Sequence, residues 1–106
     1  MQLIHLIAFF RRDGNFDDFC EQHSLNAESE VIEIYAREPM SLESQLGFFP
    51  SEETEGRIEF QSQGVKYHNL FDFFYFLEVV KDSKSSEQLS DEELAQKLFS
   101  YALKDA

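Results

Sequence analysis

Cysteine, glycine and proline are all scarce in this sequence of 106 residues, which has one cysteine, four glycines, two prolines and no tryptophan. A single cysteine, Cys20, excludes an internal disulfide bond, and a domain without such cross-links is typical of a reducing compartment. We therefore expect a cytoplasmic protein. None of the glycines stands in a Gly-x-Gly or Walker arrangement, so the common phosphate-binding loops are absent and no cofactor is predicted.

Hydrophobic runs long enough to cross a membrane are also missing. The longest, residues 3–10 and 70–80, have about half of the roughly 20 residues that a transmembrane helix needs. The N-terminus has neither a basic segment before its apolar stretch nor a small-residue cleavage site after it, so it does not indicate a signal peptide. These features predict a protein that does not associate with membranes.

Basic residues are few. Nine lysines and arginines stand against 21 aspartates and glutamates, which leaves a net charge of −12 that is divided equally between residues 1–50 and 51–106. Such a domain repels nucleic acids and anionic membranes and attracts basic proteins. We therefore expect a basic protein partner and no direct contact with nucleic acid. The alternative is that the charge serves only to keep the protein soluble.

The N-terminal third predicts three elements. Residues 2–10 are almost continuously apolar and end at the turn-like segment 11–14, which fits a strand buried on both faces. A helix is the alternative, because the larger side chains of this segment also recur at helical spacing. Asn15 is a typical N-cap and predicts a helix over 15–24. Residues 31–36 are β-branched and aromatic and predict a strand.

The middle of the chain predicts a loop, a hairpin and a helix. Residues 38–56 show no periodicity and contain both prolines, which indicates a long loop. Residues 57–62 alternate in polarity and pair with 65–67 in the predicted hairpin, whose turn is Gln63–Gly64. A strongly aromatic helix is expected over 69–82. A helical wheel of this segment has no broad polar face, so the helix must lie in the centre of the protein or one side of it must contact a partner.

The C-terminal helix has the clearest start. Ser90 and Glu93 have the spacing of a capping box, which follows the polar connector 81–89 and precedes an amphipathic stripe. The order strand, helix, strand, loop, two strands, two helices predicts a single α+β domain over residues 1–106. In it, a small, largely antiparallel sheet of about four strands packs against three helices.

Catalytic and metal-binding patterns are weak. Cys20 and His23 have the spacing of metal ligands on a helix, but no second Cys/His pair completes a structural zinc site, so no metal is predicted. A nucleophile formed by Cys20 and His68 would need the fold to bring them together, and nothing local marks Cys20 as activated. The alternative is that Cys20 packs in the core. We expect a protein that is not an enzyme.

The most distinctive segment for binding is residues 46–56. It places adjacent aromatics, Phe48 and Phe49, beside a cluster of carboxylates, Glu52, Glu53 and Glu55. Protein interfaces concentrate binding energy in buried aromatic anchors, and charges at the rim govern the encounter rate. These five residues are therefore the predicted partner-binding site. The alternative is that the phenylalanines fold back over the core and leave an ordinary solvated turn.

In its size, acidity, aromatic richness and lack of a catalytic motif, the chain resembles the small immunity proteins of bacterial toxin–immunity pairs, including those of contact-dependent growth inhibition. The resemblance covers overall character and no motif. It implies a cytoplasmic protein that neutralises a toxin, commonly a basic nuclease, by covering its active site. A phage-encoded inhibitor or nucleic-acid mimic would have the same composition. A different alternative is a structural or regulatory protein that self-associates through the helix over 69–82.

Overall fold

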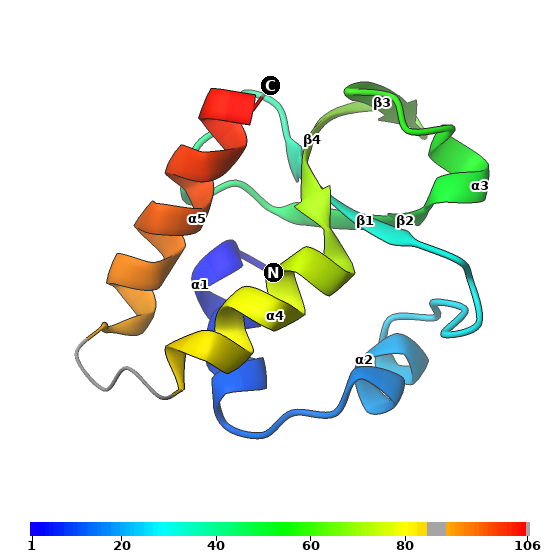
Figure 1. The fold of residues 1–106 in the computed structure, drawn as a ribbon. Helices are drawn as coiled ribbons and strands as arrows, with labels where there is room; N and C mark the ends of the chain where they lie inside the picture. The colour runs from blue at the N-terminus through cyan, green and yellow to red at the C-terminus, as the bar shows by residue number, and fades with distance from the viewer. Residues whose placement is uncertain (85–88, 106) are drawn as a thin grey trace.

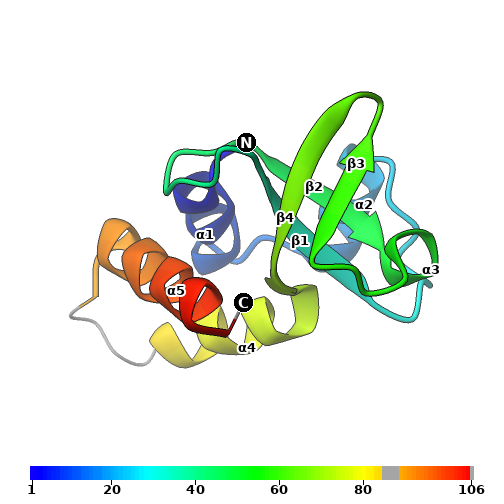
Figure 2. The ribbon, with the colours of Figure 1, turned by 90° about the horizontal axis from the view of Figure 1, so that it is seen from above.

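The computed structural model describes residues 1–84 and 89–105 and has the predicted α+β class (Figure 1). Its elements are α1 (Leu3–Arg11), α2 (Phe16–Gln22), β1 (Ile32–Arg37), β2 (Leu46–Pro50), α3 (Ser51–Thr54), β3 (Glu59–Ser62), β4 (Val65–Asp72), α4 (Phe73–Ser83) and α5 (Asp91–Asp105). Over the described ranges, the strands form one antiparallel sheet in the order β2-β1-β4-β3. Helices α1, α4 and α5 lie together beside one face of this sheet (Figure 2).

The apolar run 2–10 folds as part of the helix α1, so the strand expected there is wrong and the helical alternative is confirmed. The buried side chains of α1 recur at helical spacing, and they are Leu3, Leu6, Ile7 and Phe10. A central strand at this position would need a place in the sheet, but β1 is already flanked by β2 and β4. Packing against other helices therefore decides the conformation of this apolar run.

At the C-terminal end of α1, Arg11 forms an ion pair with Asp91 of α5 at 3.0 Å.

The two capping predictions are confirmed. The Asn15 side chain accepts hydrogen bonds from the backbone N–H groups of Asp17 and Asp18, at 2.8 and 3.2 Å, and starts α2. Ser90 and Glu93 form the reciprocal bonds of a capping box before α5, each at 3.1 Å. These bonds lower the pKa of the Glu93 carboxyl. Of the predicted connector 81–89, residues 81–83 are helical and belong to α4, Lys84 is the C-cap of that helix, and residues 85–88 lie outside the described residues.

The predicted loop over 38–56 is wrong for its second half, which folds as β2 followed by α3. Strand β2 pairs with β1 along its length, with Phe48 opposite Ile34 and Phe49 opposite Glu33. A strand here gives hydrogen-bond partners to one side of β1, whose backbone groups would otherwise be buried without any. Because α1 and α3 are both helical, the described chain has five helices rather than three.

The hairpin of β3 and β4 is confirmed, and its turn residues Gln63 and Gly64 both have positive φ angles, as a tight hairpin turn requires. Strand β4 is longer than predicted and runs to Asp72, so the following helix α4 begins at Phe73 rather than at 69. A β-bulge in the pairing of β1 with β4 leaves Leu70 as the extra residue. This bulge allows the consecutive side chains of Leu70 and Phe71 both to be buried.

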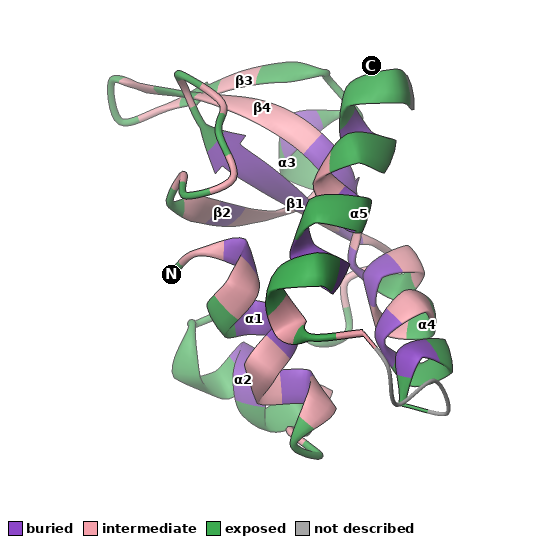
Figure 3. Ribbon diagram, turned by 90° about the vertical axis from the view of Figure 1, so that its left-hand side faces the viewer, coloured by how far each residue is buried: buried purple, intermediate pink, exposed green. Residues whose placement is uncertain are grey.

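The main core lies between the sheet and the helices (Figure 3). Phe73, the first residue of α4, is at its centre and is fully buried. Its ring contacts the rings of Phe10, Phe16, Phe19, Phe48 and Phe76, with centroids 5.1 to 5.9 Å apart. Residues of three helices and one strand thus meet at a single side chain. No helix in the described part of the chain has the length and apolarity needed to cross a membrane.

A second aromatic cluster covers the opposite face of the sheet. It consists of Tyr35, Phe49, Phe60 and Tyr67, whose ring centroids lie 5.0 to 6.1 Å apart. The hydroxyl of Tyr35 donates a hydrogen bond to the backbone carbonyl of Arg57 at 2.5 Å. Gly47 lies under these rings, and a Cβ there would come within 2.8 Å of the Tyr67 ring. The close packing of the cluster therefore depends on a glycine in β2.

Adjacent phenylalanines in α4 test this arrangement. Phe73 is 0% exposed and Phe74 is 50% exposed. We expect Phe73→Ala to lower the free energy of unfolding by about 3–5 kcal/mol, because it leaves a cavity in the core. Phe74→Ala should cost no more than about 1 kcal/mol. Denaturant unfolding of the two variants measures the difference, and equal losses would contradict the placement of the Phe73 ring.

Candidate functional site

The structure separates the five residues that the sequence grouped as a binding site. Phe48 faces the helices and packs against Phe19 and Phe73, with centroids 5.2 and 5.9 Å apart. Phe49, the next residue of β2, lies on the other face in the second aromatic cluster. Both rings are thus packed within the protein.

The carboxylates of Glu52, Glu53 and Glu55 are exposed, on α3 and at its C-terminal end. Within residues 46–56, these three carboxylates are thus exposed, whereas Phe48 and Phe49 are half-buried.

A groove of about 280 Å³ lies near α3, where the end of β4 meets the start of α4 and the end of α5. It is lined by Glu33, Ile58, Asn69, Leu70, Phe71, Asp72, Tyr75, Tyr101 and Ala102. These residues come from β1, the segment before β3, β4, α4 and α5, so no one stretch of sequence defines the groove. Its lining combines two carboxylates with aromatic and aliphatic side chains.

The two carboxylates of the groove belong to directly opposed residues, because Glu33 of β1 is paired with Asp72 of β4 in the sheet register. Like charges at opposed positions of an antiparallel pair are destabilising. Within residues 1–84 and 89–105, no lysine, arginine or histidine forms an ion pair with either of them. The groove therefore has a negative charge that a bound cation would compensate.

Hydrogen bonds hold one oxygen of each carboxylate in place. Oε2 of Glu33 accepts a bond from the Thr54 hydroxyl at 3.1 Å, and Oδ1 of Asp72 accepts one from the backbone N–H of Tyr75 at 2.7 Å, which caps α4. The buried Thr54 belongs to α3, so this bond also ties α3 to the groove. Both carboxylates are thus oriented before any ligand binds, which reduces the entropy that binding would cost.

The walls of the groove are suited to the apolar part of a long cationic side chain. Tyr75 and Tyr101 stack on each other with ring centroids 4.6 Å apart and an interplanar angle of 18°. Ile58 is 57% exposed and adds apolar surface to the wall of the groove. Aromatic rings beside carboxylates are a favourable setting for a guanidinium group, which stacks on rings and binds carboxylates at the same time.

Sequence reasoning missed this groove, although one signal was present. Glu33 is the charged residue in an otherwise apolar run, Val31–Ala36, and a carboxylate in a central strand needs a structural or functional reason. Asp72 gave no such signal, because it was assigned to the interior of a helix rather than to the end of a strand. The pairing of these two residues depends on the register of β1 and β4.

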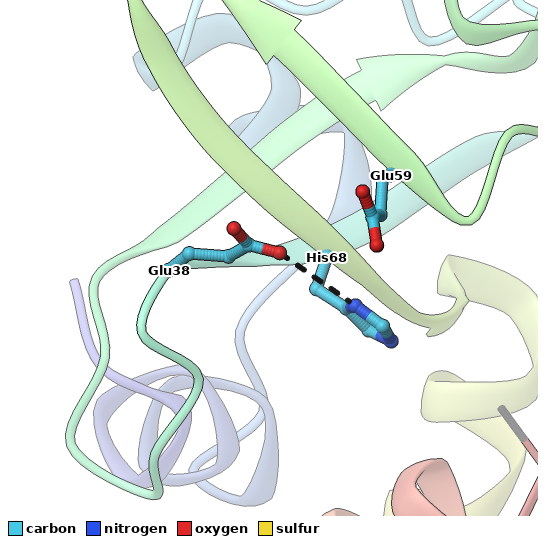
Figure 4. A group of neighbouring side chains, drawn as sticks. All are labelled: Glu38, Glu59 and His68. Carbon is cyan, nitrogen blue, oxygen red and sulfur yellow. Dashed lines mark ion pairs between the residues drawn. The ribbon is translucent and has the colours of Figure 1, made fainter.

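A second polar cluster joins Glu38, Glu59 and His68 (Figure 4). Nδ1 of His68 lies 3.9 Å from Oε1 of Glu38, and one potential ligand atom from each of the three residues lies within 4.8 Å of the other two. Glu59 is directly opposite His68 in the pairing of β3 with β4. Two carboxylates and an imidazole are a donor set that divalent transition metals accept. No metal ligand was predicted at these positions.

The other metal candidate of the sequence, Cys20 with His23, lies in a different environment. Cys20 is 1% exposed and belongs to the main core, whereas His23 is exposed and stacks on the Phe19 ring with centroids 4.2 Å apart. Burial raises the pKa of the Cys20 thiol, and the nearby Asp17 carboxylate adds to this effect. A raised pKa lowers the fraction of thiolate, which is the nucleophilic and metal-binding form.

No protein-family model matches this sequence, and neither a curated protein nor a solved structure matches it. The resemblance to immunity proteins accordingly rests on overall character alone. The charge and geometry of the chain itself have to support any assignment of function.

The environment of Cys20 gives a test of the core around α2. The native protein should react with Ellman's reagent at neutral pH at least about 100 times more slowly than the protein unfolded in guanidinium chloride, because the thiol is buried and protonated. The absorbance of the released thiolate measures both rates. Equal rates would show that Cys20 is accessible and would contradict its placement in the core.

Proposed function

We propose that this protein binds a basic protein partner and that a cationic side chain of the partner enters the groove between Glu33 and Asp72. The observation that carries this proposal is the opposed pair of carboxylates, which are held in place by hydrogen bonds and have no cationic partner within the described residues. The net charge of −12 favours the same class of partner, because it attracts basic proteins over long distances.

The carboxylates of Glu52, Glu53 and Glu55 have a separate role in this proposal. They are exposed, and Glu55 forms an ion pair with Arg57 at 3.5 Å. Exposed charges contribute little binding energy but accelerate the encounter of oppositely charged proteins. We assign them to steering, and we assign the anchoring contact to the groove.

The form of binding that we propose is inhibition, as in an immunity protein that covers the active site of a basic toxin in the cytoplasm. The protein needs no catalytic chemistry for this activity. A guanidinium or ammonium group of the toxin would be withdrawn from its own substrate and held by the groove. If the toxin is a nuclease, the acidic surface would also take the place of the nucleic-acid backbone.

Self-association through the aromatic helix is less well supported by the packing of α4. Phe73, Phe76 and Val80 are buried in the protein's own core. Phe74 is the exposed phenylalanine of this helix in the described structure, and a single half-exposed ring is a small surface for a stable homodimer. We therefore do not propose this alternative.

The groove can be tested with arginine amide as the probe and citrulline amide as its uncharged control. In ¹H–¹⁵N NMR titrations, arginine amide should shift the backbone signals of Asn69, Asp72 and Tyr101, and citrulline amide should not. The double variant Glu33→Gln/Asp72→Asn should lose the response, whereas Glu78→Gln, an exposed carboxylate of α4, should keep it. Equal responses in wild type and the double variant would rule out the groove as the cation site.

The same double variant should be more stable than the wild type. Glutamine can still accept the Thr54 bond and asparagine is an equally good N-cap, so both substitutions remove charge and leave the hydrogen bonds possible. Relief of the like-charge pair should raise the free energy of unfolding by about 0.2–1 kcal/mol. Urea denaturation measures this gain. A loss of stability would mean that the carboxylates serve the fold rather than a ligand.

The steering role needs a protein partner. The first candidate is the product of the gene directly upstream, where a toxin gene precedes its immunity gene. Reversing Glu52, Glu53 and Glu55 to lysine should slow association by about 10- to 1,000-fold at low salt, and about 0.1 M salt should reduce that difference. Each substitution should change the free energy of unfolding by no more than about 0.5 kcal/mol. Surface plasmon resonance at two salt concentrations measures the rates, and unchanged association would refute this role.

A further inference from the structure

We infer that Glu38, Glu59 and His68 form a binding site for a divalent transition-metal ion, with zinc as the best-suited probe. The three residues come from separate parts of the chain: Glu38 follows β1, Glu59 begins β3 and His68 lies in the middle of β4. Figure 4 shows the two carboxylates and the Nδ1 side of the imidazole directed toward a common space. This site is independent of the groove and of the proposed partner.

Sheet register places these ligands together. His68 is opposite Glu59 on one side and opposite Ala36 on the other, and Glu38 is two residues beyond Ala36, so all three side chains share one face. The backbone N–H of Glu38 donates to the carbonyl of Lys66 at 2.9 Å, which fixes the position of Glu38 next to β4. The side chains of Glu38 and His68 are 32% and 21% exposed, so an ion can reach them from solvent.

Protein groups satisfy the cluster only weakly. Nδ1 of His68 and Oε1 of Glu38 are 3.9 Å apart, which is close enough for an ion pair but too long for a hydrogen bond. In the described part of the chain, no lysine or arginine pairs with Glu38 or Glu59. A cation bound at Nδ1 would supply a partner to that nitrogen and would offset the negative charge of the two carboxylates.

The ligand set determines which ions the site can take. An imidazole nitrogen favours zinc, cobalt, nickel and copper over magnesium and calcium, which prefer oxygen ligands alone. Three protein ligands leave at least one coordination position for water or for a donor of another molecule.

The site should bind its ion with moderate affinity. Coordination through Nδ1 leaves the ring hydrogen on Nε2, where the described residues offer no acceptor. Such outer partners usually contribute about 10- to 100-fold to metal affinity, so we expect micromolar rather than nanomolar binding.

Calorimetric titration of zinc chloride into the full chain tests the site. We expect one ion per chain, and Glu38→Gln, Glu59→Gln and His68→Gln should each weaken binding at least about tenfold. Glu43→Gln removes an exposed carboxylate elsewhere and Cys20→Ser removes the thiol, and both should bind as the wild type does. Magnesium chloride at the same concentration should give no saturable heat, which separates coordination from the general attraction of cations to an acidic protein.

A measurement on the wild type alone covers the case in which a variant does not fold. Long-range ¹H–¹⁵N NMR follows the ring nitrogens of all three histidines, and zinc should shift those of His68 more than those of His5 and His23, which are exposed. The inference is overturned if zinc gives no saturable binding, if magnesium binds equally well, if the control variants weaken binding as much as the cluster variants, or if the His68 nitrogens do not move.

Discussion

Packing around the ring of Phe73 is the interaction on which the rest of the structure depends. The residue stands where β4 ends and α4 begins, so its burial joins the sheet to the helical layer through a continuous stretch of chain. Its ring contacts side chains of α1, α2 and β2 as well as its own helix. Since the junction cannot shift without opening the core, the end of β4 is held in one register against β1.

The groove between Glu33 and Asp72 follows from this fixed register of β4 against β1. Burying Leu70 and Phe71 in succession requires the bulge in β4, and the bulge aligns Asp72 with Glu33 on the neighbouring strand. The core thus creates an unfavourable pair of charges at the edge of a groove, where a ligand can relieve it. Local conflicts of this kind are often found where a protein binds something. The Glu38, Glu59 and His68 cluster depends on the same strand, because the pairing of β4 with β1 and β3 positions all three residues.

Several features could be predicted because their physical cause lies within a few residues. Asn15 and Ser90 cap helices through hydrogen bonds to groups two or three positions away, and Gln63–Gly64 turns a hairpin through its own backbone angles. The burial of Cys20 next to Phe19 follows from the spacing of apolar residues on a short helix. The surplus of negative charge is known from the amino-acid composition alone, and it supports the class of partner that we propose.

The sequence by itself therefore determined the α+β class, the capped helices, the hairpin and the acidic character. Tertiary structure alone decided that the first apolar run forms the helix α1 and that residues 46–50 join β1 as a strand. It also decided that β4 continues to Asp72, where Glu33 is its partner. Each of these outcomes depends on a partner distant in sequence, because an apolar run is compatible with helix and strand alike. The segments that pack beside the run decide between helix and strand. They determine which conformation buries more apolar surface and pairs more backbone groups.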